Sequence, residues 1–168
     1  MTAPLDPEDF AQRQLHLRQA TAADVPRINK VAVLSKAFWG YSPEQLALWR
    51  DDLVVDPKTA IEWPTVVAES DGQISGFAQL DPTRNPWDLA RLFVEPGAHR
   101  QGVGRNLLTW IQGLAAEAGQ AEISIDSDPH AAAFYIACGA TVTATSVVSA
   151  AAPCVRRRQK PACRGRTA

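Results

Sequence analysis

The sequence contains little cysteine and no long apolar run. Its three cysteines (Cys138, Cys154 and Cys163) are odd in number and lack the paired spacing of a metal site. We therefore expect free thiols, a reducing cytoplasmic location and no bound metal. No apolar stretch approaches the length of a membrane span, and the first residues lack the basic-then-apolar layout of a signal peptide. A membrane partner is therefore not expected.

Acidic residues are missing from the end of the chain. From residue 150 onward there are six Lys and Arg and no Asp or Glu, whereas residues 1–149 carry eleven basic against eighteen acidic residues. Basic charge without a groove-reading element or interleaved aromatics predicts no specific nucleic-acid partner. We expect a loose arm over residues 1–14, one domain over 15–149 and a basic, solvated tail over 150–168. The acidic body suits a cationic amine substrate.

Hydrophobic periodicity and turn residues predict six strands and four helices. The strands are expected over residues 15–18, 65–69, 74–80, 89–94, 121–127 and 141–148. The helices are expected over residues 21–39, 42–55, 103–118 and 130–138. Ser42 opens the second helix with a capping box, and Asp56 followed by proline is expected to end it, which leaves 58–64 as a connector. The buried stripe of that helix is expected at Leu46, Trp49 and Leu53.

Two local patterns determine the expected sheet. The turn signal Asp71-Gly72, flanked by β-forming residues, predicts an antiparallel hairpin. A strand, a helix and a further strand around Gly102 require a right-handed parallel crossover. We therefore expect an α/β (α+β) fold: a mixed, mostly antiparallel sheet with helices on both faces and a central strand–glycine loop–helix crossover.

A basic, glycine-punctuated turn links the apolar strand 89–94, expected to be buried, to the helix that follows it. A helix that begins there points unpaired backbone N–H groups and the positive end of its dipole into the turn. Gly102 and Gly104 have no side chain to keep an anion away, and Arg100 and Arg105 add positive charge. This turn therefore predicts a phosphate or pyrophosphate site.

The spacing of the glycines narrows the choice of ligand. A dinucleotide-binding turn needs a third glycine where Leu107 stands, and a P-loop needs Gly-Lys-Ser/Thr where Arg105 follows the last glycine. The turn instead resembles the pyrophosphate loop of the GNAT superfamily of acyl-CoA N-acyltransferases, with the pattern Gln/Arg-x-x-Gly-x-Gly/Ala. Here it reads His-Arg-Gln-Gly-Val-Gly over 99–104, so histidine replaces Gln/Arg at the first position.

The resemblance covers residues 15–148 and implies acetyl-CoA as cosubstrate. It implies a pyrophosphate site formed by His99, Arg100, Gln101, Gly102, Val103, Gly104 and Arg105. It implies that the strand end contacts the pantetheine and donates an N–H to the thioester oxygen, through Leu92, Phe93 and Val94. Asp128 is either a pantetheine contact or a helix cap, and Trp39 and Tyr41 either line the acceptor pocket or belong to the core or rim. In the family, a hairpin of two strands closes the sheet. Residues 151–158 would be the second strand of that hairpin, but their composition suits a strand poorly. We therefore expect the final strand to be short, distorted or missing.

Acetyl transfer also needs a proton donor and a base. The run 131–140 resembles the family's Ala-x-x-Phe-Tyr-x-x-x-Gly-Phe pattern, which makes Tyr135 the candidate acid for the thiolate, with a buried core tyrosine as the alternative. The candidate bases are Asp88, favoured by the resemblance, Glu69 and Glu95, and the residues do not choose among them. Cys138 is interpreted as a small buried thiol because no partner stands at a spacing that would activate it.

The resulting hypothesis is an N-acetyltransferase in which a primary amine, from a small molecule or a peptide, attacks acetyl-CoA directly in a ternary complex. The alternative is a non-catalytic acyl-CoA-binding or regulatory module that keeps the glycine loop without a productive base. A nucleic-acid-binding protein led by the basic tail is a third class. The acceptor, the acyl chain length and the oligomeric state, a homodimer included, stay open.

Overall fold

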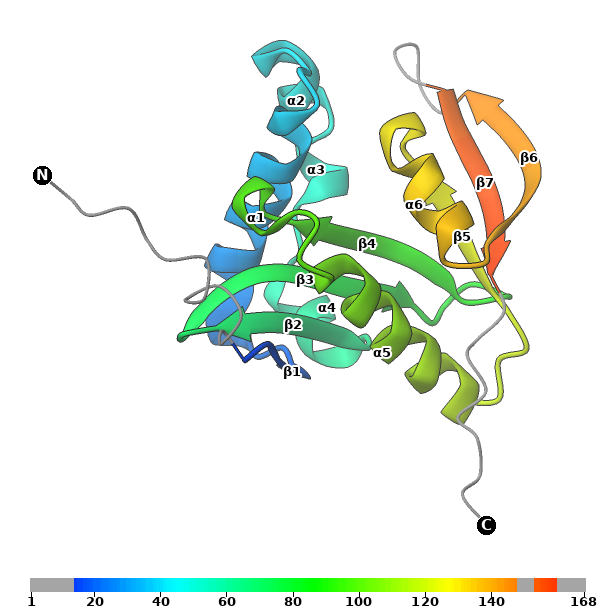
Figure 1. Ribbon diagram of the computed structural model, residues 1–168, viewed down its shortest axis with the longest axis horizontal. Coiled ribbons are helices and arrows are strands. Elements are labelled where there is room, and N and C mark those ends of the chain that lie inside the picture. The colour runs from blue at the N-terminus through cyan, green and yellow to red at the C-terminus, as the bar shows by residue number, and fades with distance from the viewer. Residues whose placement is uncertain (1–13, 148–152, 160–168) are drawn as a thin grey trace, which may run out of the picture.

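The computed structural model describes residues 14–147 and 153–159, which form one seven-stranded sheet flanked by helices (Figure 1). The strands are β1 (His16–Gln19), β2 (Thr65–Ser70), β3 (Gln73–Asp81), β4 (Asp88–Val94), β5 (Ile123–Ser127), β6 (Thr141–Val147) and β7 (Pro153–Gln159). Their order is β1-β2-β3-β4-β5-β7-β6, and β4 and β5 are parallel while the other neighbours are antiparallel. The expected mixed, mostly antiparallel sheet is confirmed.

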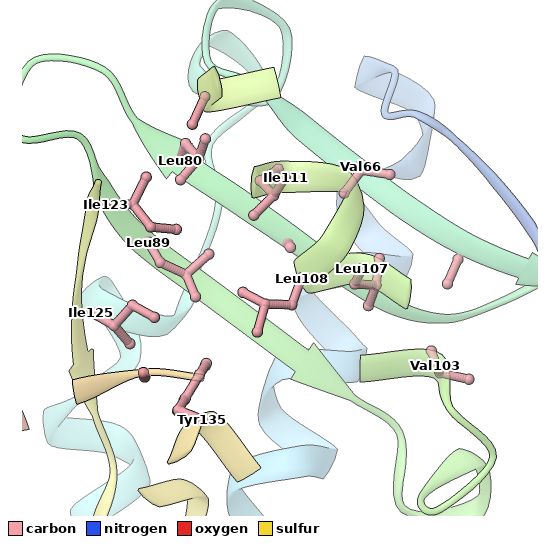
Figure 2. Close-up of a cluster of buried hydrophobic side chains, with 14 residues drawn as sticks. Val66, Leu80, Leu89, Val103, Leu107, Leu108, Ile111, Ile123, Ile125 and Tyr135 are labelled. Atoms are coloured by element: carbon pink, nitrogen blue, oxygen red, sulfur yellow. The ribbon is translucent and has the colours of Figure 1, made fainter. Parts of the chain in front are cut away.

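Helices cover both faces of the sheet. They are α1 (Val25–Phe38), α2 (Pro43–Leu48), α3 (Arg50–Leu53), α4 (Pro57–Glu62), α5 (Val103–Glu117) and α6 (Ala132–Ala137). Side chains alternate along a strand, so Val66 of β2 packs in the core beneath α5 while its neighbour Val67 packs in the core beneath α1. Figure 2 shows the first of these cores, in which α5 contributes Leu107, Leu108 and Ile111.

The approach of α5 to the sheet depends on a glycine in β3. A Cβ atom placed on Gly76 would lie 3.0 Å from Leu107 Cδ1 and 3.1 Å from Val103 Cγ1. A side chain at that position would push the helix away from the strands, because a packed interior has little free space. The start of α5 is therefore held close to the end of β4, where the candidate phosphate loop lies.

Several local signals form the structures expected of them. The Ser42 hydroxyl accepts a hydrogen bond from Gln45 N, and the Gln45 side-chain oxygen accepts one from Ser42 N, which completes the capping box of α2. Asp71 and Gly72, with φ of 52° and 73°, form the tight turn of the β2–β3 hairpin. Asp128 caps the turn before α6 by accepting from His130 N.

Three expectations about the helical segment are wrong. The single helix 42–55 is divided in two at Trp49, and of the expected stripe only Leu53 is fully buried. The segment 58–64 is mostly helix rather than connector. Asp56 accepts from Lys58 N and Thr59 N and so begins α4 with proline at its first position. An Asp-Pro pair both disfavours helix before it and caps a helix after it, and the second effect prevails here.

The C-terminal segment also differs from the expectation of a weak or missing strand in a solvated tail. Residues 153–159 form β7, which pairs antiparallel with β5 on one side and β6 on the other. Two neighbouring strands satisfy its backbone groups, which overrides its poor β-forming composition. Residues 1–13 of the expected arm lie outside the described residues, as do 148–152 and 160–168, which include Cys163 and most of the expected tail. The domain limits stay an expectation.

One ion pair joins the first strand to the first helix. Arg18 of β1 donates to both carboxylate oxygens of Asp24, at 2.8 and 2.9 Å, and also contacts Glu69 of β2 at 2.9 Å. Asp24 further accepts from the backbone N–H and the hydroxyl of Thr21. The hydrogen bond from Arg18 is the main cause that lowers the pKa of Asp24 to about 2.

We expect Asp24→Asn to lower the free energy of unfolding by about 1–3 kcal/mol at pH 7, because the charged hydrogen bonds to Arg18 are lost. A depressed pKa stabilises the fold above the ordinary carboxyl value of 3.8 and loses that contribution as the pH falls toward 2. Denaturant unfolding at pH 7, 4 and 2.5 should therefore show the gap to wild type closing, and Asp52→Asn on exposed α3 should show almost no gap. A gap independent of pH would contradict the assignment.

Candidate functional site

The central strands β4 and β5 part soon after they meet. Their pairing consists of Asp88 opposite Ser124 in the part of the chain that the structure describes, supported by a hydrogen bond from Ser124 N to Trp87 O. A cleft of about 910 Å³ opens beyond that point, between β4, the end of β5, α1, α6 and the start of α5. The expectation that 89–94 is a buried strand is therefore wrong: Leu89 is its one buried residue, because β5 moves away from the rest.

A bulge in β4 sets which way its side chains point into this region. Leu80 of β3 stands opposite Leu89, and the preceding residue of β3 stands opposite Arg91, so Ala90 is the extra residue. After the bulge Leu92 packs on the α5 side and Phe93 on the α1 side. Bulges re-aim side chains at strand positions where pairing ends, and this one lies in the wall of the cleft.

The start of α5 forms one end of the cleft and is suited to an anion. Gly102, the residue before the helix, has φ of 79° and provides no side-chain cap for the first N–H groups of α5. Arg100 also has a left-handed φ of 61°, which is costly for arginine and marks a constrained turn. Arg100 and Arg105 both line the cleft. Uncapped N–H groups, the helix dipole and two cations together make a site that fits a diphosphate.

The two loop glycines serve different needs. Gly102 adopts the left-handed conformation that glycine accommodates without strain. Gly104 lies where an added Cβ would be 3.3 Å from Phe134 Cζ of α6 and 3.6 Å from Val94 Cγ2. Gly104 therefore lets α5 approach α6, in addition to leaving the loop open to an anion as the sequence suggested.

The histidine that departs from the motif lines the cleft and also contacts the end of β4. His99 Nε2 lies 3.0 Å from Val94 O, and its ring meets Phe38 edge-on at 5.0 Å between centroids. Gln101 does not line the cleft and donates to Gly97 O instead. Both side chains contact backbone carbonyls at the ends of the turn and so support its shape. Their contact with an anion stays a prediction.

The candidate acid, Tyr135, lies in the wall of the cleft and is nearly inaccessible, with 6% of its surface exposed. Burial, with a smaller contribution from the nearby Cys138 thiol, raises its pKa above the ordinary value of 10. Its hydroxyl therefore stays protonated throughout the neutral range. Cys138 is in no disulfide and is half-buried rather than fully buried.

A polar cluster joins the two sides of the cleft. Lys36 of α1 forms an ion pair with Asp128, which follows β5, at 2.6 Å, and Tyr41 donates to the same carboxylate oxygen at 2.8 Å. Burial alone would raise the pKa of Asp128. The hydrogen bonds from Lys36 and His130 N, together with the positive charge of Lys36, outweigh that effect, so the pKa of Asp128 lies below its usual range. Trp39 stacks on His130 at 5.1 Å and lines the cleft, whereas Tyr41 lies outside the lining and reaches it through Asp128.

None of the three candidate bases lines the cleft. Glu69 pairs with Arg18, and Glu95 pairs with Arg27 at 2.6 Å. Asp88 lies at the paired end of β4 and β5, opposite Ser124, and accepts a hydrogen bond from the Ser124 hydroxyl at 2.6 Å. Burial raises the pKa of Asp88 despite that hydrogen bond, and nearby Asp126 raises it further.

Several lining residues were not singled out from the sequence. They are Lys36, Arg91, Asp126, Ser127, His130 and Phe134. The carboxyl ends of parallel strands meet at one edge of a sheet, and this signal could have drawn attention to Asp126 and Ser127. No cluster of three metal-ligating side chains occurs among the described residues, and none of their helices has the length and apolar character to cross a bilayer.

Comparison with known proteins identifies a family and a relative that this chain matches. The acetyltransferase (GNAT) domain family matches residues 41–154. Peptidyl-lysine N-acetyltransferase YiaC of Escherichia coli K12 is 33% identical over 100 residues, which is 57% of this chain and 64% of YiaC, so the match spans less than two thirds of that relative.

Solved structures of low identity share the fold. The PaiA N-acetyltransferase of Thermoplasma acidophilum, in complex with coenzyme A, has a TM-score of 0.72 at 19% identity over 88% of this chain and 99% of that one. A GCN5-related N-acetyltransferase of Rhodopseudomonas palustris has a TM-score of 0.76 at 23% identity, covering 86% and 94%. YncA of Salmonella typhimurium, with its cofactor acetyl-CoA, has a TM-score of 0.65 at 20% identity, covering 90% and 96%.

We expect Gly104→Glu to abolish coenzyme A binding, because its carboxylate would stand beside the anion site and its side chain would displace Phe134. Titration calorimetry should show at least about a 100-fold loss of affinity, the size expected when like charges replace a charge-assisted contact. Gly97→Glu adds the same charge where a Cβ meets nothing within 4 Å, and should retain most of the affinity. Equal losses in both variants would refute the local role of Gly104.

Proposed function

Because this chain belongs to the GNAT family of acetyltransferases, we propose that it transfers an acetyl group from acetyl-CoA to a primary amine in a ternary complex. The observation that carries the proposal is the parting of β4 from β5 directly beside the uncapped start of α5. That arrangement offers a diphosphate site and an unpaired strand edge in one cleft. Acetyl-CoA supplies the activated acetyl group as a thioester.

In this proposal the cosubstrate is held mainly by backbone. Arg100, Arg105 and the N–H groups from Gln101 to Gly104 bind the diphosphate, and the turn supported by His99 keeps them in place. The edge of β4 over residues 92–94 pairs with the pantetheine arm as a further strand would. A backbone N–H of that edge donates to the thioester oxygen, where negative charge develops. Asp128 stays tied to Lys36 and closes the cleft beside the pantetheine.

The reaction also requires proton transfers at the amine and at the thiolate. Nitrogen attack forms the C–N bond and breaks the C–S bond, so one proton leaves the nitrogen and another reaches the thiolate. We assign the proton for the thiolate to Tyr135, whose raised pKa keeps its hydroxyl proton available. A lysine-like amine, with a pKa near ~10.4, is protonated and must lose one further proton before it attacks. We assign the removal of both protons from the nitrogen to Asp88, acting through a water that passes them on to solvent and to the tyrosinate, because Asp88 does not line the cleft.

The acceptor enters from the side of α1 and α2. Trp39 forms part of the lining there, and Tyr41 fixes the adjoining carboxylate of Asp128. YiaC, which resembles this chain, is named for action on peptidyl-lysine, and this supports an amine of the lysine type, free or within a peptide.

A second candidate, an acyl-CoA-binding module without turnover, is favoured by one observation: none of the expected bases lines the cleft. A thiol-release assay over a panel of primary amines separates the two functions. Amine-dependent release of coenzyme A supports the transferase. Calorimetric binding of acetyl-CoA without release on any amine would favour the module, and absence of binding would refute both.

We expect Tyr135→Phe to lower kcat by about 100-fold, the usual contribution of a positioned proton donor, while the Kd for acetyl-CoA changes little. The substitution removes one oxygen from a packed side chain, so thermal unfolding serves as the control for folding. Steady-state thiol release and calorimetry give the two quantities. An unchanged kcat would remove Tyr135 from the mechanism, and a parallel loss of acetyl-CoA affinity would assign it to binding.

A further inference from the structure

A half-buried cation with no ion-pair partner among the described side chains lies in the wall of the cleft. Arg91 of β4 donates from Nη1 to the Gln79 side-chain oxygen at 2.8 Å and from Nη2 to Val54 O at 3.0 Å. Its Nε is buried and has no hydrogen-bond partner among the described residues. Both partners are neutral, so the positive charge of Arg91 has no carboxylate within ion-pair distance among the side chains that the structure describes.

This arrangement is costly for the protein alone. Burial lowers the pKa of Arg91, which shows that its charge is poorly solvated. The carboxylates of Asp52, Asp56 and Asp81 act on it only from a distance. Buried charges in proteins are normally paired, and a buried N–H without an acceptor loses its hydration without compensation. The described structure therefore leaves Arg91 short of an anion.

The position of Arg91 relates it to the acceptor. It lines the cleft, follows the bulged Ala90 and directly precedes the strand edge that starts at Leu92. Its hydrogen bond reaches Val54 O, just after α3. Arg91 alternates with Leu92 and so shares the face of β4 on which Phe93 packs toward α1, one of the two helices beside which acceptor entry is proposed. In the proposed function the acetyl group lies beside residues 92–94 of β4. Successive residues of a strand are about 3.3 Å apart, so one small molecule can span the distance from Arg91 to that position.

We propose that Arg91 binds a carboxylate of the acceptor, so that the preferred substrates are primary amines that also carry a carboxylate. This inference rests on the acetyltransferase function proposed above. A guanidinium presents five N–H donors in a planar fork that matches a carboxylate, and two of them are used by Gln79 and Val54. The carboxylate comes either from a free amino acid or from an acidic residue beside a peptide lysine.

The competing explanation is a structural tie. Arg91 links β4 to β3 and to the chain after α3, and removing it could loosen the site for every substrate. Such a role would lower turnover of charged and neutral acceptors alike. A carboxylate-binding role changes the ratio between them, which makes the ratio of kcat/KM values the quantity to measure.

The experiment compares matched acceptors that differ only in charge. Lysine is paired with lysinamide, β-alanine with β-alaninamide, and a Lys-Glu peptide with its Lys-Gln counterpart, all assayed by thiol release with acetyl-CoA. In at least one pair, the wild-type kcat/KM should be at least about tenfold higher for the acid than for its amide. The pair in which this preference occurs shows whether the carboxylate belongs to a free amino acid or to a peptide. Arg91→Gln should lower that ratio by about 10- to 100-fold.

Two further variants serve as controls. Arg91→Lys keeps the charge without the planar fork and should keep part of the preference. Arg84→Gln removes an equal charge from the exposed β3–β4 connection and should keep all of it. The inference would be overturned if amines were acetylated with no preference for the acid in any pair. It would also be overturned if Arg91→Gln had the same acid-to-amide ratio of kcat/KM as wild type. Either result would leave the proposed acetyltransferase function intact. Failure of every amine to release thiol would overturn the proposed function itself.

Discussion

The separation of β4 from β5 is the constraint on which the rest of the cleft depends. Two parallel strands that part expose backbone groups that a sheet would otherwise pair, and such groups are costly unless another partner meets them. β5 avoids this cost on its other edge, where β7 pairs with it from Ile123 to Ser127. β4 is held by β3 on one edge, so its free edge faces the cleft. The fold thereby keeps an edge available for a ligand instead of for a strand.

Side-chain ties keep this opening in shape. His99 joins the loop to Val94 O at the end of β4, and Lys36 joins α1 to Asp128 beyond β5. The first tie acts at the diphosphate end and the second spans the cleft between its two walls. Gly76 and Gly104 complete this framework by letting α5 approach the sheet and α6.

Local signals in the sequence predicted most elements and the position of the loop, because each depends on a few consecutive residues. The capping box at Ser42 and the turn at Asp71-Gly72 are of this kind. The fate of Asp56 was not predictable, because the same dipeptide ends one helix and begins another. β7 was missed because its pairing depends on two strands that precede it in the chain.

The side chains of the cleft also fall into two groups: those that belong to a local motif and those that depend on contacts with distant residues. Residues of the glycine loop lie along the cleft as a short motif would suggest, whereas Lys36 meets a partner 92 residues away and Arg91 meets one 37 residues away. Such contacts leave no pattern in a local window. In the proposed enzyme, backbone groups of the glycine loop and of β4 therefore bind the cosubstrate, and charged side chains from distant parts of the sequence select the acceptor. Selectivity can then change through single substitutions at positions such as 91 without disturbing the loop that binds the diphosphate.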